Sequence, residues 1–180
     1  QALYAREHVA LGIDGTDRML EKAAKWNLAP TLEAGGVIVF PHAGVDDCGH
    51  QIAAAVLACL DSGADTVMVI SVLHAFTQEM DDARIRVAQG ADVTQEKYWG
   101  IQGTAIPGPR QEWQDDHALH SFRHFWRAET ARRGMEGPRV IERYPYLAGG
   151  RPEILPGIDE LAREAEDAVI VSTADPFHYG

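Results

Sequence analysis

The fold is decided by the segment Val37-Ile38-Val39-Phe40-Pro41-His42-Ala43-Gly44. Its first four residues are all apolar, and such a run predicts a strand that is buried on both faces. Proline cannot continue a central strand, so we expect the strand to end at Pro41 and His42 to follow its carboxyl end. In open α/β sheets, ligands bind outside those carboxyl ends. This segment therefore predicts both a sheet and a site.

Two later segments repeat the pattern of a buried strand followed by a histidine. Val67–Val72 is an apolar run that precedes His74, and Val169–Ser172 is another that precedes Asp175 and His178. Between the first two strands, residues 51–62 have apolar side chains at helical spacing, and Gly63 ends that helix. A strand, a helix and a strand in this order predict parallel pairing. We therefore expect an α/β fold with a mostly parallel sheet, flanked by helices, and a metal site at the carboxyl ends of its strands.

Weaker patterns predict the remaining elements. Apolar spacing after Thr16 or Asp17 indicates a helix that runs to about Asn27, and the aspartates at 115 and 116 are typical of the first turn of a helix. The other expected elements are an edge strand at 84–87, a loop at 101–109, a strand at 140–147 and a helix at 158–166.

Length and composition limit the class of protein. The 180 residues fit one α/β domain over residues 1–180, and the net charge of −11 argues against a nucleic-acid partner. No stretch approaches the roughly 20 apolar residues of a membrane span, so no membrane partner is expected. Two cysteines make no disulfide framework, which favours a reducing cytoplasm. Because the chain begins with Gln1 and stops just after His178, we expect both ends to be cut and a missing C-terminal piece to carry further site residues.

Four histidines lie at the starts or ends of the expected elements: His42, His74, His117 and His178. Any one of them alone is explained as a local cap or hydrogen-bond partner. Together they favour a metal site, because neutral imidazole is a common ligand for Zn, Cu and Fe(II). Two histidines and one carboxylate, with open positions, is the arrangement of non-haem Fe(II) oxygenases.

The segments PHAGVDDCG, VMVISVLHAF, DDHALH and VSTADPFHYG resemble the Memo family in sequence and in order. That family is related to the LigB-type class III extradiol ring-cleavage dioxygenases. The resemblance covers about residues 35–180 and is closest at PHAG and at the terminal D-x-x-H-Y-G. It implies a mostly parallel α/β sheet, in agreement with the strand pattern.

The resemblance also assigns roles to individual residues. His42 and His74 match the two histidine ligands, and His117 matches a histidine that resembles the acid–base group of the dioxygenases. Phe177 occupies the position of the third ligand and cannot bind a metal, so it is expected to line the site. Four further residues complete the candidates: Asp175 as a replacement ligand, His178 as a replacement ligand or catalytic group, His120 as an additional nitrogen ligand, and Asp116 beside His117.

By this resemblance we expect an Fe(II)-dependent oxygenase of the extradiol type, with Zn or Cu as other candidate metals. Its expected partners are O₂ and a small aromatic substrate such as a catechol or an aminophenol. Two alternatives remain open, a Memo-like metal-binding protein without dioxygenase activity and a Zn-dependent hydrolase with the same ligands. A homo-oligomer is also compatible with the sequence.

The remaining polar candidates have simpler interpretations. His8 is expected to be solvent-exposed or to act as a cap, His124 to be solvent-exposed, and Cys48 and Cys59 to be small buried thiols. The chain contains neither a nucleophile elbow nor a P-loop, so those two motifs give no support to a serine hydrolase or a nucleotide-binding protein.

Overall fold

Five strands form one sheet in the order β1-β5-β2-β4-β3 in the computed structural model, which describes residues 2–107, 111–149 and 151–174. Neighbouring strands are parallel except for β3, which runs antiparallel to β4. This topology confirms the predicted α/β fold with a mostly parallel sheet. The strands are β1 (Val37–Pro41), β2 (Thr66–Ile70), β3 (Gly100–Gly103), β4 (Arg139–Tyr146) and β5 (Val169–Ala174).

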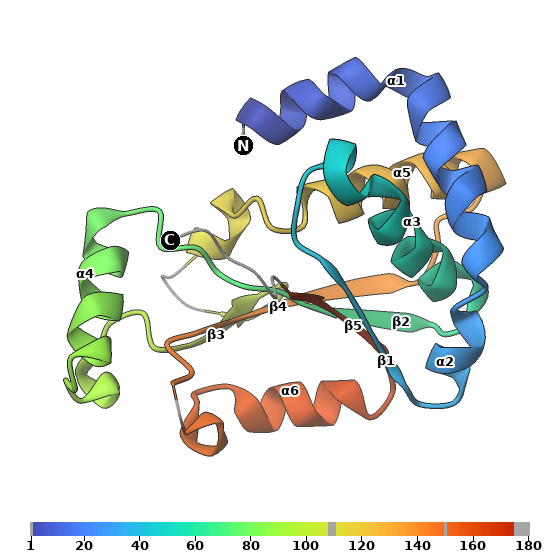
Figure 1. The fold of residues 1–180 in the computed structure, drawn as a ribbon. Coiled ribbons are helices and arrows are strands. Elements are labelled where there is room, and N and C mark those ends of the chain that lie inside the picture. The colour runs from blue at the N-terminus through green and yellow to red at the C-terminus, as the bar shows by residue number, and fades with distance from the viewer. Residues whose placement is uncertain (1, 108–110, 150, 175–180) are drawn as a thin grey trace.

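The helices are α1 (Ala2–Ala23), α2 (Ala29–Glu33), α3 (Val45–Asp61), α4 (Gln78–Ala88), α5 (His120–Arg133) and α6 (Ile158–Ala165). Figure 1 shows α1, α3 and α5 over one face of the sheet, α6 against the other face, and α4 to one side. Within the described residues, no helix has both the length and the apolar character that crossing a membrane requires.

The centre of the sheet is as buried as its sequence predicts. Val67, Met68 and Val69 of β2 have no exposed surface, because β5 and β4 flank this strand and helices cover both of its faces. On one of these faces lies α3, which packs against α1, α5 and β1 and is therefore buried around most of its circumference. Its residues with no exposed surface are Val45, Ala53, Ala55, Val56 and Cys59.

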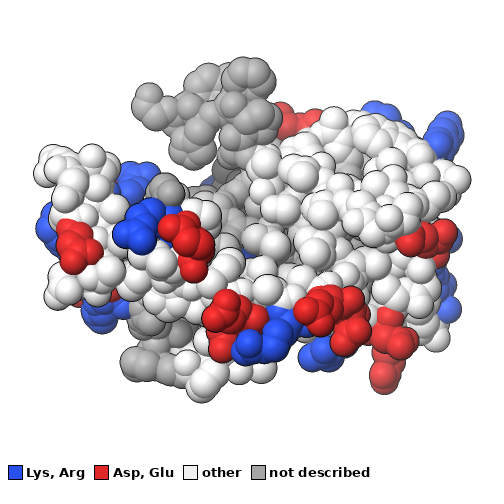
Figure 2. All heavy atoms as spheres, turned by 90° about the horizontal axis from the view of Figure 1, so that it is seen from below, with Lys and Arg blue, Asp and Glu red and all other residues white. Residues whose placement is uncertain are grey.

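The prediction that β1 is buried on both faces is wrong. Ile38 and Phe40 are buried, but Val37 and Val39 are 49% and 61% exposed. Alternate residues of a strand point to opposite faces, and β1 is the edge strand of the sheet. Figure 2 shows the α6 side of the molecule, where charged side chains form a band and uncharged surface extends beside it. One face of β1 is therefore covered and the other is open.

The first helix is longer than its sequence indicates. It begins at Ala2 rather than near Thr16, and the α-helical stretch ends at Ala23. The chain kinks at Gly12, where φ is 62° and ψ is −174°. Glycine adopts a positive φ at little steric cost, so α1 consists of two helical segments joined at this residue.

The segment predicted as an edge strand at 84–87 belongs to helix α4. Thr77 caps this helix by accepting a hydrogen bond of 3.2 Å from the backbone N of Met80. Met80 and Ala83 face the core at helical spacing, with 0% and 1% exposure. Alternation of apolar and polar residues over only four positions is compatible with a strand or with a helix. The buried positions of Met80 and Ala83 show that the segment is a helix.

Two further expectations differ from the structure. The expected loop at 101–109 begins with residues of β3, which pairs with β4. The helix expected to open at Asp115 starts instead at His120, after a short 3₁₀ turn over Glu112–Asp115. The intervening Asp116 accepts a hydrogen bond from the backbone N of Ala118 at 2.7 Å, and this side-chain turn competes with helix formation.

Candidate metal centre

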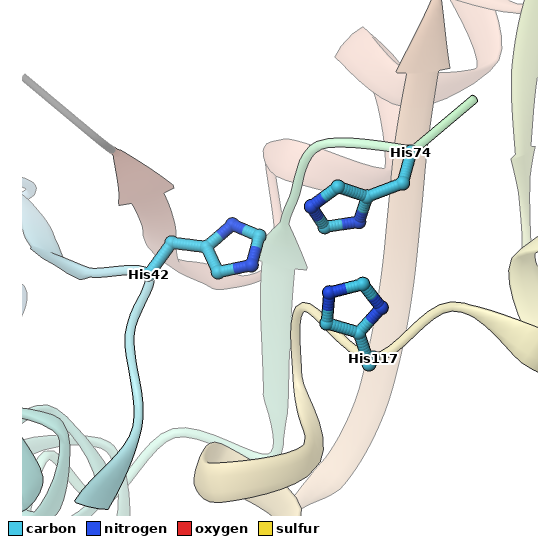
Figure 3. A group of neighbouring side chains, drawn as sticks. All are labelled: His42, His74 and His117. Atoms are coloured by element: carbon cyan, nitrogen blue, oxygen red, sulfur yellow. The ribbon is translucent and has the colours of Figure 1, made fainter. Parts of the chain in front are cut away.

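Three histidines from separate segments meet beyond the carboxyl ends of the strands. His42 follows β1 directly, His74 lies four residues beyond β2, and His117 precedes α5. The backbone N of His42 donates to the carbonyl of Ala174 at 3.4 Å, which extends the pairing of β1 with β5. Because β5 also pairs with β2, the sheet brings the first two histidines to the same edge. Figure 3 shows the three rings turned toward one another.

The ring geometry suits one shared ion. One nitrogen from each of His42, His74 and His117 lies within 4.8 Å of the others. The rings of His74 and His117 stack, with centroids 4.1 Å apart, and His42 meets the ring of His74 edge-on at 4.8 Å. Nitrogens bound to one ion at about 2.1 Å lie closer together than this, so binding requires small side-chain rotations. We call these three residues the strand-end cluster.

Asp116 fixes the orientation of His74. Its fully buried carboxylate accepts hydrogen bonds from the backbone N of His74 at 2.7 Å and from its ring Nδ1 at 3.0 Å. Burial raises the pKa of Asp116, but hydrogen bonds from His74 and Ala118 outweigh it and hold the pKa below its usual value. The ionised carboxylate can only accept, so His74 Nδ1 carries the proton and Nε2 keeps its lone pair. A carboxylate behind a histidine is the usual support of a metal ligand.

His117 is also held in the neutral form that binds metals. Burial lowers its pKa to about 4, and the charge of a protonated His74 acts in the same direction. Asp116 opposes this shift but is outweighed. His117 therefore offers a neutral imidazole near neutral pH.

Glu7 of α1 secures the loop that carries His42. Its Oε2 accepts a hydrogen bond of 3.1 Å from the backbone N of Val45, at the start of α3. A Cβ atom on Gly44 would lie 2.3 Å from that oxygen, so any other residue here would force the Glu7 carboxylate to shift. No local pattern indicates this role, because 38 residues separate Glu7 from Val45.

A cavity of about 810 Å³ adjoins the cluster, and its lining includes His42 and His74. A volume of this order is typical of small-molecule sites. The walls contributed by the loop after β2, α4 and β4 are largely apolar, and they include Leu73, Val87, Tyr146 and Leu147.

The strand-end cluster brings together three of the predicted site residues, with Asp116 directly behind them. His120 is not part of this group but lies at the first position of α5. Asp175, Phe177 and His178 lie outside the described residues, so their predicted roles stay predictions.

The other predictions have mixed outcomes. Cys48 and Cys59 are buried as predicted, and burial raises the pKa of the Cys59 thiol to about 12. The exposure predicted for His8 and His124 is wrong, because both are partly buried and stack on one another at 4.3 Å.

No protein-family model, curated protein sequence or solved structure shows significant similarity to this chain. The resemblance to the Memo family therefore rests on the quoted motifs alone.

Proposed function

We propose that the strand-end cluster holds a divalent metal ion, with Fe(II) as the first candidate, and that the protein is an oxygenase of the extradiol type. The observation that carries this proposal is the convergence of His42, His74 and His117, with Asp116 orienting the second of them. Three nitrogen ligands leave coordination positions open. When bound there, Fe(II) would supply those positions to O₂ and to the oxygen atoms of a substrate.

The cavity beside the cluster supports a small aromatic substrate. Its volume of about 810 Å³ accommodates a single ring, and its walls are largely apolar, with Arg84 as a charged member of the lining. The Tyr146 hydroxyl donates to the carbonyl of Met80 at 2.9 Å, so this residue offers a ring rather than a hydrogen-bond donor to a ligand. We propose a catechol or an aminophenol as the substrate class, as the Memo and extradiol resemblance implies.

His117 has two proposed roles that one variant separates. As a general base it would accept a proton from the substrate hydroxyl, and His117→Ala would then lower turnover by about 10²–10⁴-fold while the metal stays bound. As the third nitrogen ligand it would be needed for binding, and the same variant would lose the metal. Metal content and turnover measured on one purified sample decide between the two roles.

A zinc-dependent hydrolase is the second candidate, and the donor set favours it. Three neutral imidazoles are a known ligand set of catalytic zinc, and zinc lowers the pKa of the water molecule that it binds. Among the described residues, the converging side chains are three histidines and no carboxylate. Fe(II) oxygenases commonly have one carboxylate ligand.

Reconstitution with defined metals tests the proposal. The chain is stripped of metal, loaded anaerobically with Fe(II) or Zn(II), and assayed for O₂ uptake with catechols and for hydrolysis of activated esters. We expect O₂ uptake that depends on Fe(II) and on the substrate. Ester hydrolysis with Zn(II) and no O₂ uptake with Fe(II) would support the second candidate. Tight metal binding with neither activity would indicate a metal-binding protein without dioxygenase activity.

A further inference from the structure

A second group of histidines lies between helices α1 and α5. His120 and His124 are four residues apart on α5, so they project from the same side of that helix. His8 of α1 stacks on His124, with centroids 4.3 Å apart and an interplanar angle of 16°. His8 also lies close enough to His120 for the charge of one to lower the pKa of the other. We call these three residues the helix cluster.

Hydrogen bonds of Thr16 determine which nitrogen of His124 carries the proton. The Thr16 hydroxyl donates its single proton to the carbonyl of Gly12 at 2.8 Å. The contact of 3.0 Å between Thr16 Oγ1 and His124 Nε2 must therefore be donated by the ring. A neutral ring protonated at Nε2 has its lone pair at Nδ1. Thr16 thus orients His124 as Asp116 orients His74, by accepting the proton of one nitrogen and leaving the other to bind.

The surroundings keep the helix cluster neutral. Burial lowers the pKa of all three rings, and Arg127 acts in the same direction on each. A groove of about 540 Å³ opens beside His8 and His124, and the charged residues of its lining are Asp17 and Arg132. An ion can therefore reach the rings from solvent.

From this geometry we propose that His8, His120 and His124 form a second binding site for a divalent transition-metal ion such as Zn(II), which joins α1 to α5. Spacing of four residues on a helix places two imidazoles on one side, and His8 supplies a third from another element. Binding requires His8 and His124 to rotate out of their stack. This rearrangement is larger than the one at the strand-end cluster, where one nitrogen from each ring already lies within 4.8 Å of the others.

The proposed ion would also affect the first site indirectly. His8 follows Glu7, whose carboxylate secures the loop of His42 through the backbone N of Val45. An ion that fixes His8 against α5 would hold Glu7 in place. The helix cluster is nevertheless proposed independently of the function of the strand-end cluster.

Zinc stoichiometry tests this proposal. The metal-stripped full chain is titrated with Zn(II), and bound metal is measured after gel filtration. We expect two ions in the wild type, one in His124→Ala and one in the double variant H42A/H74A. His50 is the matched control, because it is a partly buried histidine on α3 that meets the ring of Trp26 edge-on. His50→Ala should retain two ions.

A gentler variant covers the case in which His124→Ala folds poorly. Thr16→Val keeps all three histidines and removes the hydroxyl that accepts from His124, together with its hydrogen bond to the carbonyl of Gly12. We expect about 10-fold weaker binding of the second ion and unchanged binding of the first. Two ions in His124→Ala, or equal zinc affinity in Thr16→Val and the wild type, would overturn the proposal. A wild type that binds one ion and loses it in H42A/H74A would also overturn it. One ion that is lost only in His124→Ala would instead overturn the strand-end site.

Discussion

The strand-end cluster and the helix cluster each consist of three histidines, but different contacts hold those histidines in place. In the first, the segments that carry the histidines are set by the pairing of β1 and β2 with β5, and His74 donates to the ionised Asp116. In the second, the positions are set by helical spacing, and His124 donates to the neutral hydroxyl of Thr16. The first adjoins a cavity of about 810 Å³ and the second a groove of about 540 Å³.

This difference in partners predicts a difference in affinity. A buried carboxylate adds a negative charge beside the bound ion and makes the histidine a stronger donor, whereas a hydroxyl adds no charge. We therefore expect the strand-end cluster to bind a divalent ion more tightly. The helix cluster should fill second and bind with lower affinity.

The largest expected effect is the loss of the first ion in His42→Ala. Removal of one of three ligands should weaken binding at the strand-end cluster by at least about 100-fold, while the fold persists because His42 lies beyond the end of β1. Metal analysis and circular dichroism on the same sample measure both results. A variant that retains stoichiometric metal at this cluster would show that His42 is not a ligand.

Asp116→Asn should have the next largest effect, because it removes the charge and keeps the shape. We expect about 10–100-fold weaker metal binding at the strand-end cluster. Binding at the helix cluster should not change, since its orienting partner is Thr16. Competition titrations with a chelator of known affinity measure the two constants. Equal weakening at both clusters would indicate a general loss of structure.

The helix cluster should make the metal-free protein sensitive to acid. Burial, followed by the charges of His124 and His120, lowers the pKa of His8 from 6.5 to about 4. Between these two values the unfolded chain binds more protons than the folded one, so stability is complete above about pH 6.5 and falls as the pH approaches 4. Because the ring is partly exposed, we expect a loss of only about 1 kcal/mol from this residue.

Chemical denaturation at a series of pH values measures this loss. His8→Asn should make the free energy of unfolding less dependent on pH between those two values. Some dependence should remain, because the pKa values of His117, His120 and His124 are also lowered. An unchanged dependence in the variant would mean that His8 titrates normally in the folded chain.

Gly44→Ala should have the smallest effect, and it tests the contact between α1 and the loop of His42. The added methyl group would displace Glu7 and break its hydrogen bond to Val45. A single hydrogen bond of this kind contributes about 1 kcal/mol, which corresponds to a decrease in Tm of roughly 2–4 °C. Differential scanning calorimetry measures the shift. Glu7→Ala should give a similar decrease, and Glu21→Ala on the exposed side of α1 should give none.

The sequence predicted the sheet and the strand-end histidines because both depend on local patterns. An apolar run that ends at Pro41 or before His74 is visible within eight residues, and parallel pairing brings such ends together. The limits of α1 and α4 were not predictable in this way. Four alternating residues at 84–87 fit a strand as well as a helix, and the buried faces of Met80 and Ala83 decided the outcome.

The helix cluster was missed because its members are far apart in the chain. The contact of His8 with Ser121 joins residues 113 positions apart, and no local pattern predicts such a pair. One signal was present, since His120 and His124 have the spacing of one helical turn. The third ligand predicted at 175–178 lies outside the described residues, so that part of the site stays a prediction.

The sheet order has a consequence for folding during synthesis. β5 lies between β1 and β2, yet it is the last of the five strands in the described part of the chain, more than 120 residues after β1. Pairings between such distant segments form slowly, because a long loop must close first. On the ribosome, β1 and β2 must wait for β5 to emerge before they are joined. His42 and His74 therefore come together only after β5 has paired with β1 and β2, and an ion bound by both histidines would oppose separation of these strands.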